Sequence, residues 1–525
     1  MLNYGKTNNP AKTRIQPSKY YLVAFLIILL GTFLRFFLLT NKSLWLDEGY
    51  SLYYSQGSNA QQVINRFFEA DTGDRFQPFY YLVLYYWRQL FGNSEFAVRS
   101  LSALSGVGAV IVLFLTALQT YGKKHAIWLV LFLSVSSYAI YYSQQTRAYA
   151  LLLFLASLQL YFFTKALRTS QTSGKVSARW MLLFCITTGV NLFFSILIAI
   201  FTFSIFLAHT IVYKNLKQWF KWWVIAALCC LPAIIFYLSS PVATTPTEVN
   251  VTPSKQPVIQ NLIFVLYGLL VGETYGPPIE ELRGGNRIQI LLSYLPHLSV
   301  LLVFAIILFL AVIRGWWQNN LDQSDRQLDT FFILLFTLSL ALGAIFAIAT
   351  KFNWLPRHSF YIYIPLVFLI PLAVRRPFRS HKNSNFLWQL GQIAVIALIV
   401  INIYSVANYY FNRDYQREDY RVVAQYLVQH QSPSVKSVLL YGSPNLLPYY
   451  GDTQTLYGLE LDTSNLAQEV RKITNDASQV LIAISFQSFW EQKKNFSLER
   501  SMSELYNLES KTSFTNFHIY HFVKK

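Results

Sequence analysis

Charged residues are scarce in this chain of 525 residues: Asp, Glu, Lys and Arg together make up 13% of it. Soluble domains carry about a quarter. Hydrophobic residues make up 54%, and the mean hydropathy is +0.34. This composition excludes a cytosolic globular enzyme, whose single core would need a charged shell. It also excludes a disordered scaffold, because such chains have low hydrophobicity.

Cysteine is equally rare. Cys185, Cys229 and Cys230 all fall inside apolar runs, so a secreted disulfide module is excluded and packing among apolar groups is expected. Residues 1–19 are polar and basic, without the pattern of a cleavable signal. The first apolar run, 20–39, is longer than the hydrophobic part of a signal peptide, and we expect it to be a membrane span.

The chain has many apolar runs of about 20 residues, which is the length that a bilayer-spanning helix needs. They predict a polytopic α-helical membrane protein with about eleven spans. The expected spans are 20–39, 98–119, 126–142, 148–166, 179–191, 192–213, 223–240, 290–313, 329–350, 358–374 and 386–407.

The net charge of +18 comes from the membrane part. Residues 1–410 hold 31 Lys and Arg against 13 Asp and Glu, whereas residues 411–525 hold 12 of each. The basic residues fill alternate short loops, which predicts an N-terminus inside and, with an odd number of spans, a C-terminus outside. This distribution explains the basic excess without a nucleic-acid partner. We predict a multi-pass protein of the cytoplasmic (inner) membrane, surrounded by membrane lipids.

The chain divides near residue 411 into a transmembrane domain, 1–410, and an extracytoplasmic domain, 411–525. In the second, helical patterns at 422–427 and 466–473 alternate with strand-like runs at 437–441 and 479–486, which indicates a small α/β domain. It lacks glycine-rich phosphate loops, so no nucleotide cofactor is expected. The outer loops 40–97 and 241–289 hold ten of the 13 acidic residues that precede residue 411.

The first candidate site residues are Asp47 and Glu48, in the segment SLWLDEGY eight residues after the first span. Carboxylates at a membrane exit are costly unless solvated. The pair is compatible with a general base at the membrane surface, and with ligands of a divalent metal ion, or with an ordinary exposed loop. A general base suits transfer to a hydroxyl or amine acceptor.

The second candidate segment is YYSQQTRAY, residues 141–149, in a very short outer loop. It contributes Gln144, Gln145 and Arg147. An arginine in the outer leaflet runs against the usual loop bias, so an anionic group is expected near it. The alternative is that Arg147 extends to lipid headgroups.

The third candidate segment is KFNWLPRHSF, residues 351–360, which contributes Lys351, Arg357 and His358. Three cationic donors outside the membrane indicate a phosphate or carboxylate partner, with lipid headgroups as the alternative. Arg35, near the outer end of the first span, is a further candidate, although a side chain extending to the interface is the simpler interpretation.

A carboxylate pair with several outer cations suits one reaction type. A sugar on a lipid phosphate already carries a good leaving group, so cations that stabilise the phosphate and one base that activates the acceptor suffice. A single base acting opposite the leaving group gives inversion, unlike the two-carboxylate hydrolases.

These segments resemble a known family. LRFFLLTNKSLWLDEGYSL resembles the first loop of the GT-C glycosyltransferases, which include the protein O-mannosyltransferases and the lipid A aminoarabinose transferase. QPFYYLVLYYWRQLFGNSEFAVRSLSAL and YYSQQTRAYAL are similar to the segments that follow. The subgroup that the chain resembles most is the bacterial RgtA/B/C/D-like transferases. The resemblance covers roughly residues 20–210 and, more loosely, Arg357 and His358.

The resemblance implies roles for individual residues. Asp47 matches the catalytic acid, which acts as base, and Glu48 its partner, positioning the acceptor or a metal. Arg147 and Arg357, with His358, match positions associated with the lipid phosphate. Gln145 stands where the family usually has Glu. The loss of that carboxylate leaves metal binding open.

The resemblance thus implies a polyprenyl-phosphate sugar donor and a lipid, polysaccharide or protein acceptor, in cell-envelope glycan biosynthesis. The alternatives are a transporter or flippase of lipid-linked sugars, and an inactive family member that serves as a binding subunit. Transporters place ionisable groups near the midplane, often with repeat symmetry, whereas the expected spans hold no acidic residue apart from Asp329 at one end, and we find no repeat. The second long loop could line the acceptor entrance, but the preferred interpretation of its three acidic residues is solvated loop charges: Glu273, Glu280 and Glu281.

Overall fold

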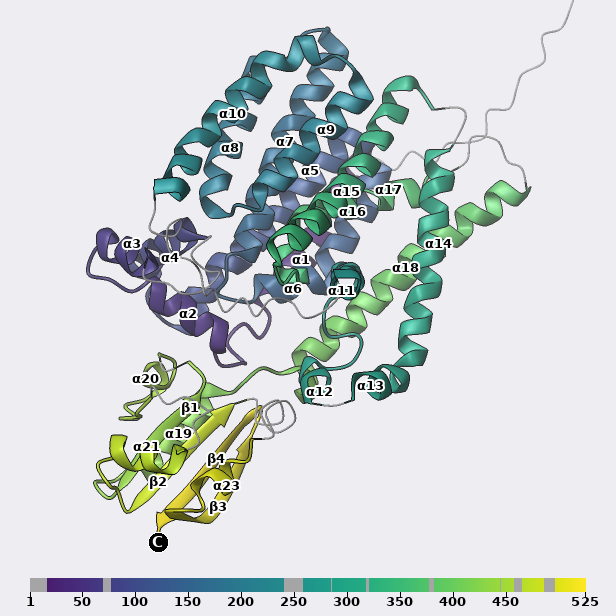
Figure 1. Ribbon diagram of the computed structural model, residues 1–525. Helices are drawn as coiled ribbons and strands as arrows, with labels where there is room; N and C mark the ends of the chain where they lie inside the picture. The colour runs from purple at the N-terminus through teal and green to yellow at the C-terminus, as the bar shows by residue number, and fades with distance from the viewer. Residues whose placement is uncertain are drawn as a thin grey trace, which may run out of the picture.

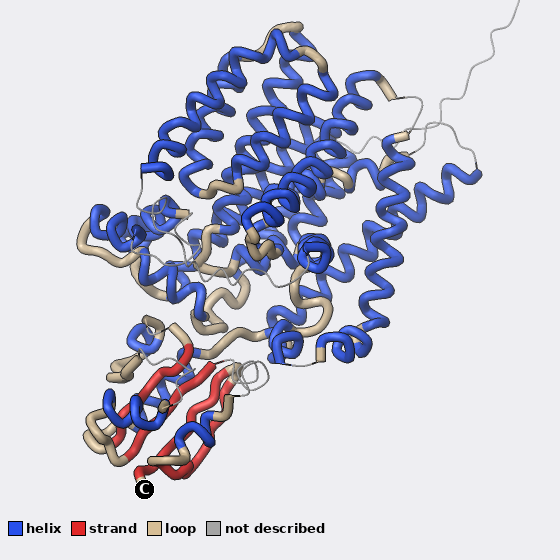
Figure 2. Tube along the Cα trace, in the orientation of Figure 1, coloured by secondary structure: helices blue, strands red, loops and turns tan. Residues whose placement is uncertain are grey.

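The computed structural model describes residues 17–68, 77–239, 258–284, 286–317, 321–376, 382–443, 445–457, 465–485 and 496–525. The helices form an elongated body, and a small sheet domain is attached at one end (Figures 1 and 2). We call this end of the helical body, which carries α2 and the sheet domain, the site end.

Seven described helices are long and apolar enough to cross a membrane. They are α1 (Pro17–Phe36), α5 (Glu95–Val135), α7 (Tyr149–Ser173), α10 (Leu216–Ser239), α14 (Leu295–Trp316), α15 (Gln323–Thr350) and α18 (Lys382–Phe411). Shorter apolar helices complete the body, namely α8 (Ala178–Phe194), α9 (Ile198–Tyr213), α11 (Val258–Val271), α16 (Phe360–Val367) and α17 (Ile370–Ala373).

Helix α5 has 41 residues, but it turns back on itself at Gly122, where φ is 75° and ψ is 178°. The guanidinium of Arg35 shows the reversal. It donates to the Ser134 carbonyl at 3.4 Å, and its Nε lies 3.1 Å from where a Cβ on Gly106 would be. A straight helix would hold residues 106 and 134 about 40 Å apart. Two antiparallel halves therefore match the two spans predicted at 98–119 and 126–142.

The expected spans at 179–191 and 192–213 correspond to α8 and α9, which Ser195 to Leu197 separate. The expected span at 358–374 is broken into α16 and α17, after Pro365 and before Pro371. The prediction of a loop over 241–289 missed α11. Residues 240–257, which include its Pro/Thr-rich part, lie outside the described residues.

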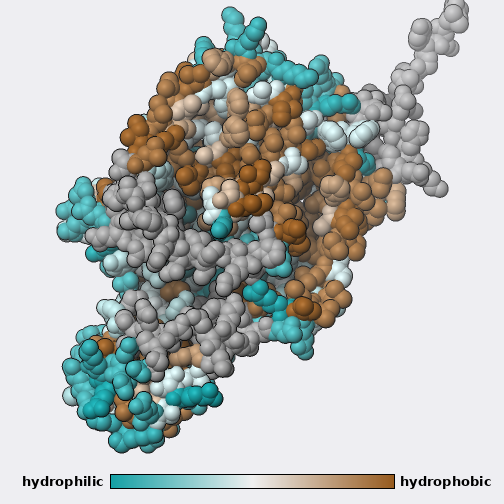
Figure 3. All heavy atoms as spheres, viewed as in Figure 1, coloured by the Kyte–Doolittle hydropathy of each residue, from teal (hydrophilic) through white to brown (hydrophobic). Residues whose placement is uncertain are grey.

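The surface of the helical body is apolar. Space-filling spheres show hydrophobic residues over the helices, and hydrophilic residues on the sheet domain and at the opposite end of the body (Figure 3). Phe25, Leu228 and Phe309 on this body have more than half of their surface exposed. Large exposed apolar side chains on long helices are expected for contact with lipid tails.

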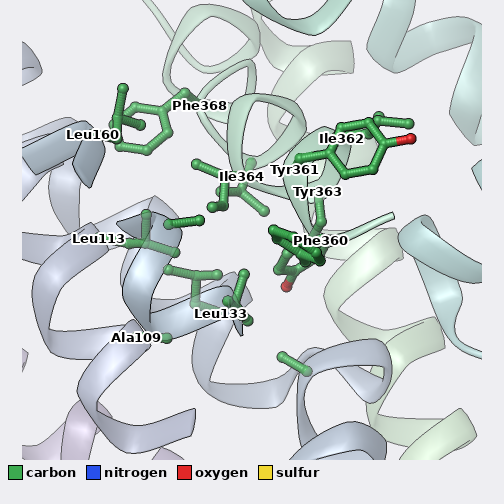
Figure 4. Close-up of a cluster of buried hydrophobic side chains, with 14 of the residues drawn as sticks. Ala109, Leu113, Leu133, Leu160, Phe360, Tyr361, Ile362, Tyr363, Ile364 and Phe368 are labelled. Atoms are coloured by element: carbon green, nitrogen blue, oxygen red, sulfur yellow. The ribbon is translucent and has the colours of Figure 1, made fainter. Parts of the chain in front are cut away.

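Inside the body, the core surrounds α16. Its residues 360–364 lie against Leu113 and Leu133 of α5, and Leu160 of α7 packs near Phe368 (Figure 4). The rings of Phe332 and Phe368 stack at 4.3 Å between centroids. This packing holds the segment that follows η3 (Pro356–His358) against the centre of the bundle.

Short elements cover the site end. They are α2 (Leu46–Tyr54), α3 (Ala60–Phe68), α4 (Pro78–Phe91), α6 (Ser137–Ser143), η3, α12 (Ile279–Gly284), α13 (Arg287–Ser293) and η4 (Arg413–Tyr415). The loops predicted to lie outside therefore meet at one end of the molecule (Figure 1). Which end faces the cytoplasm stays a prediction from the basic loops.

The sheet domain is α/β, as its patterns predict. Strands β1 (Val435–Tyr441) and β2 (Gln479–Ser485) are parallel, and β3 (Tyr506–Phe514) and β4 (Phe517–Lys524) form an antiparallel hairpin, in the order β1-β2-β4-β3. Its helices are α19 (Tyr420–His430), α20 (Leu447–Tyr450), α21 (Leu466–Ile473) and α23 (Leu498–Met502). The sequence patterns predicted neither β3 nor β4. Strand β3 is an edge strand that is mostly exposed, and its residues are largely polar.

The sheet domain shares a hydrophobic cluster with the loop that carries Asp47. Leu44 and Leu52 pack there with Leu446 and Tyr420. Gly49 lies at the contact: a Cβ on it would be 2.3 Å from the Ser443 hydroxyl. The domain therefore buttresses α2 directly.

Candidate active site

Asp47 occupies the first turn of α2, two residues after the N-cap Trp45. Backbone N–H groups at a helix N-terminus favour a carboxylate there. Its side chain is 21% exposed, and its Oδ2 accepts from Arg357 Nη1 at 3.1 Å. Asp47 is thus an accessible carboxylate paired with an arginine from 310 residues further along the chain.

Glu48 has a different environment, although it follows Asp47 directly. It is fully buried, and Arg99 of α5 donates to both of its oxygens, at 2.9 Å and 2.6 Å. The backbone N–H groups of Thr146 and Trp45 also donate to this carboxylate, at 2.7 Å and 3.3 Å. Glu48 therefore ties α2 to α5 and to the loop at 144–148, rather than facing an acceptor.

Arg147 lies beside Asp47. Its Nη1 donates to the Asp47 backbone carbonyl at 3.1 Å and to the Ser51 hydroxyl at 3.3 Å, and its Nη2 donates to the Tyr149 hydroxyl at 3.5 Å. Only 6% of Arg147 is exposed. The structure thus brings Asp47, Arg147 and Arg357, each from a different predicted outer loop, into one group.

This group holds two cations and one carboxylate: Arg357 pairs with the Asp47 carboxylate, and Arg147 donates to the Asp47 backbone carbonyl. Arg357, whose side chain is 35% exposed, keeps its charge, as an arginine does in proteins. A group with one more positive than negative charge, in which Arg357 and Asp47 are partly exposed, suits a phosphate.

His358 is not a third cation. Burial, followed by the charges of Arg357 and Arg147, holds the pKa of the His358 imidazole well below its usual range. Its Nδ1 lies 3.3 Å from the Leu355 backbone N–H, which donates to it, and its ring packs at 4.7 Å from that of Phe352. His358 shapes the η3 turn. Of the three cations predicted in this loop, only Lys351 and Arg357 remain.

Lys351 stands apart from the group. It is the exposed C-cap of α15, in a left-handed conformation with φ of 56°. Within the described part of the chain, it forms no ion pair with Asp47. Its exposure suits contact with headgroups or solvent.

Two other sequence candidates have structural contacts instead. Gln144 Nε2 donates to the carbonyls of Leu34, Arg35 and Phe37, at 2.8–3.2 Å, and so caps the end of α1. The sequence suggested that the Arg35 side chain extends to the interface, but the structure shows that it does not. It is fully buried and donates to the carbonyls of Gly31 and Leu133 at 2.8 Å and 3.1 Å.

Gln145 lines a cavity of about 390 Å³, a volume that includes open solvent. Glu48 of α2 and the N-cap Trp45 form part of its wall, whereas Asp47, Arg147 and Arg357 do not line it. The cavity adjoins a second one of about 320 Å³, since Tyr141, Tyr415 and Arg417 line both.

Arg417 separates the two cavities. It donates to the Tyr141 hydroxyl at 2.5 Å, and its guanidinium stacks 4.5 Å from the Trp45 ring centroid. Glu273 lies 3.8 Å from Arg417 Nη2 and accepts from the Tyr142 hydroxyl at 2.5 Å. The expectation that Glu273 is a solvated loop charge is therefore wrong.

Of the other two acids in this loop, Glu281 is exposed, as expected. Burial, followed by the charge of Asp414, raises the pKa of the Glu281 carboxyl. The side chain of Glu280 lies outside the described residues.

A divalent metal would need oxygen ligands that converge. Both oxygens of Glu48 already accept from Arg99 and the backbone, and Asp47 faces Arg357. Among the described residues, no three His, Cys, Asp or Glu side chains group into a metal site. The Asp47–Glu48 pair, as it lies here, does not fit a shared metal ion.

Sequence reasoning missed Arg99 and Arg417. Arg99 is the second residue of the expected span 98–119, and a charge at the start of an apolar run was the available signal. Arg417 belongs to the domain-linking segment RDYQRED, where charges look like ordinary surface residues.

Part of the chain matches a known family of sequences. The profile of the family described as Dolichyl-phosphate-mannose-protein mannosyltransferase matches residues 77–239. YkcB of Bacillus subtilis (strain 168), named as a candidate mannosyltransferase, is 25% identical over 246 residues, which are 45% of this chain and 32% of that protein. The match thus spans about a third of the length of that relative.

Solved structures share the fold over nearly the whole chain. ArnT from Cupriavidus metallidurans, bound to undecaprenyl phosphate, is similar with a TM-score of 0.55 at 13% identity, over 96% of this chain and 98% of that one. The Archaeoglobus fulgidus oligosaccharyltransferase tethered with an acceptor peptide gives 0.50 at 11% identity, over 97% and 74%. The predicted fold class is confirmed: the chain shares the fold of these solved membrane proteins over nearly its whole length.

Proposed function

We propose that this protein transfers a sugar from a polyprenyl-phosphate donor to a lipid, glycan or protein acceptor at the outer face of the cytoplasmic membrane. The observation that carries the proposal is the 3.1 Å contact between Asp47 and Arg357, with Arg147 alongside. An accessible carboxylate beside two cations supports a base next to the donor phosphate.

In the proposed reaction, the Asp47 carboxylate takes the proton of the acceptor hydroxyl. The acceptor oxygen attacks the anomeric carbon of the sugar, and the bond from that carbon to the phosphate oxygen breaks. The electron pair leaves with the polyprenyl phosphate, whose charge Arg357 and Arg147 stabilise. Attack from the face opposite the leaving group inverts the anomeric configuration.

Arg357 and Asp47 neutralise each other before substrate binds. A donor phosphate that engages Arg357 competes for the same guanidinium and releases the Asp47 carboxylate. Proton acceptance by Asp47 is then favoured when the donor is bound, and it is disfavoured while Asp47 is paired with Arg357. Glu48, held by Arg99, keeps α2 in place during this exchange.

The test is sugar transfer by the purified protein in nanodiscs. Radiolabelled polyprenyl-phosphate sugars serve as donors and total membrane lipid as acceptor, and NMR of the product reports its anomeric configuration. We expect transfer with inversion by the wild type, and at least a 100-fold loss in Asp47→Asn. Asp452→Asn, the same chemical change at an exposed carboxylate of the sheet domain, is the matched control.

Each other outcome has a definite meaning. Transfer that persists in Asp47→Asn would assign the base elsewhere. Donors that bind to the wild type without transfer would indicate a carrier of lipid-linked sugars or an inactive superfamily member. Gln145, where the superfamily usually has Glu, makes the inactive member the rival that this measurement must exclude.

A further inference from the structure

Glu273 lies in the segment that follows α11, and the backbone on both sides of it is held in place. Gly272 has a φ of 75°, and a Cβ on it would be 2.4 Å from the Ser137 hydroxyl of α6. The Thr274 hydroxyl donates to the Ser405 carbonyl of α18 at 2.7 Å. The Glu273 side chain therefore extends from a segment that is fixed against α6 and α18.

The Glu273 carboxylate is only 11% exposed, and each of its oxygens has a partner. Oε1 accepts from the Tyr142 hydroxyl at 2.5 Å, and Oε2 lies 3.8 Å from Arg417 Nη2. A hydrogen bond to a carboxylate is stronger than one between neutral groups, whereas 3.8 Å is too long for a hydrogen bond. Tyr142 is therefore the partner whose orientation Glu273 fixes most firmly.

Tyr142 connects Glu273 to the Asp47 group by way of Tyr149. The rings of Tyr142 and Tyr149 pack edge to face, with 5.2 Å between their centroids. The Tyr149 ring centroid lies 5.6 Å from the Arg147 guanidinium, and the Tyr149 hydroxyl accepts from Arg147 Nη2 at 3.5 Å. Arg147 in turn donates to the Asp47 backbone carbonyl at 3.1 Å. A continuous series of contacts thus joins Glu273 to the candidate base.

The two tyrosines of this series are buried, with 5% of Tyr142 and 4% of Tyr149 exposed. A buried hydroxyl that loses its partner is costly, so Tyr142 cannot turn away from Glu273 freely. Protein interiors are close-packed, and a ring in contact with another cannot move without displacing it. The orientation of Tyr142 therefore restricts the Tyr149 ring, and with it the Arg147 guanidinium that lies against this ring.

We propose that Glu273 is a positioning residue of the active site: its carboxylate orients Tyr142, and Tyr142 and Tyr149 together hold Arg147 where the donor phosphate binds. The proposal rests on the proposed transferase function for the phosphate, and on the contacts alone for the coupling between Glu273 and Arg147. Glu273 acts through other residues, because its contacts within the described part of the chain are with Tyr142 and Arg417 rather than with the Asp47 carboxylate.

Two substitutions act on the same hydrogen bond from its two ends. Glu273→Gln replaces the carboxylate by a neutral amide of nearly the same volume, and Tyr142→Phe removes the hydroxyl. Because both act through one contact, the double variant should show no larger effect than either single variant. Glu281→Gln, the same chemical change at an exposed carboxylate of α12, is the matched control.

The first experiment measures the coupling and needs no donor. A 3-fluorotyrosine is incorporated at position 149 of the full chain, and its ¹⁹F resonance is recorded for the protein in nanodiscs. We expect the resonance to shift in Glu273→Gln and in Tyr142→Phe, to shift no further in the double variant, and to stay in place in Glu281→Gln. A resonance that does not move in Glu273→Gln would overturn the proposal.

The second experiment measures transfer at varied concentrations of the radiolabelled polyprenyl-phosphate sugar. Glu273→Gln and Tyr142→Phe should each lower kcat/KM for this donor about ten-fold, the loss of one charged hydrogen bond, and the double variant should lose no more. Glu281→Gln should have the wild-type value. Thermal unfolding of the same samples separates positioning from folding: losses of activity that follow the decrease in Tm, with an unchanged resonance at position 149, would overturn the proposal.

The proposed function and the positioning role fail in different ways. A shift at position 149 in a protein that transfers no sugar would uphold the coupling and reject the function. Transfer by the wild type, with unchanged kinetics and an unchanged resonance in Glu273→Gln, would uphold the function and reject the positioning role. A shift in Arg417→Gln with none in Tyr142→Phe would overturn the route through Tyr142.

Discussion

The guanidinium of Arg99 donates hydrogen bonds to both carboxylate oxygens of Glu48, at 2.9 Å and 2.6 Å, and both side chains of this pair are almost completely buried. The adjacent acid, Asp47, is exposed and contacts Arg357 instead. The two neighbouring carboxylates thus have different roles: Glu48 links α2 to α5, whereas Asp47 remains accessible for chemistry.

Removal of Arg99 should destabilise the protein strongly. Arg99→Met leaves the Glu48 carboxylate buried without its partner, which costs about 3–5 kcal/mol. Thermal unfolding in detergent should show a large decrease in Tm. The double variant Arg99→Met/Glu48→Gln, which removes the uncompensated charge, should recover a substantial part of the loss. A single variant as stable as the wild type would contradict the role given to this pair.

Arg357 should act on the donor. Arg357→Gln removes one charged partner of the phosphate, and we expect kcat/KM for the lipid-phosphate donor to fall about 10–100-fold, the cost of a charged hydrogen bond. Lys351→Gln is the matched control, since it makes the same change of charge in the same loop at an exposed residue. Steady-state transfer at varied donor concentration measures both, and equal losses in the two variants would argue against a specific phosphate contact.

The contact at Gly49 should not tolerate a larger side chain. A Cβ there would lie 2.3 Å from Ser443 Oγ and 2.8 Å from Leu446 Cγ, so Gly49→Ala must push the sheet domain away from α2. Overpacking of this kind costs about 1–3 kcal/mol. We expect a lower Tm and faster proteolysis near residue 411.

Gly49→Ala/Ser443→Gly removes the closest of these clashes and should recover part of the stability. Transfer activity should fall with Gly49→Ala as well, because Asp47 lies two residues away in the same helix. If Gly49→Ala had the stability and the proteolysis rate of the wild type, the sheet domain would not pack tightly against α2 at this position.

Local sequence patterns predicted the helices well, because a span or an amphipathic helix is defined by neighbouring residues. The hairpin at Gly122 and the break between α8 and α9 follow the apolar runs closely. For the candidate site, the sequence identified Asp47, Arg147 and Arg357 as candidates. It could not predict the contacts between them, because these contacts join distant segments.

The sequence by itself determined that this is a polytopic membrane protein with an α/β domain, since hydropathy and residue alternation are local properties. Only the tertiary structure decided what each polar residue does. Arg35, Gln144 and Glu48 looked like site residues, yet they satisfy buried backbone groups or a buried charge. A polar group near a membrane must find a partner, and which partner it finds depends on packing between segments tens to hundreds of residues apart.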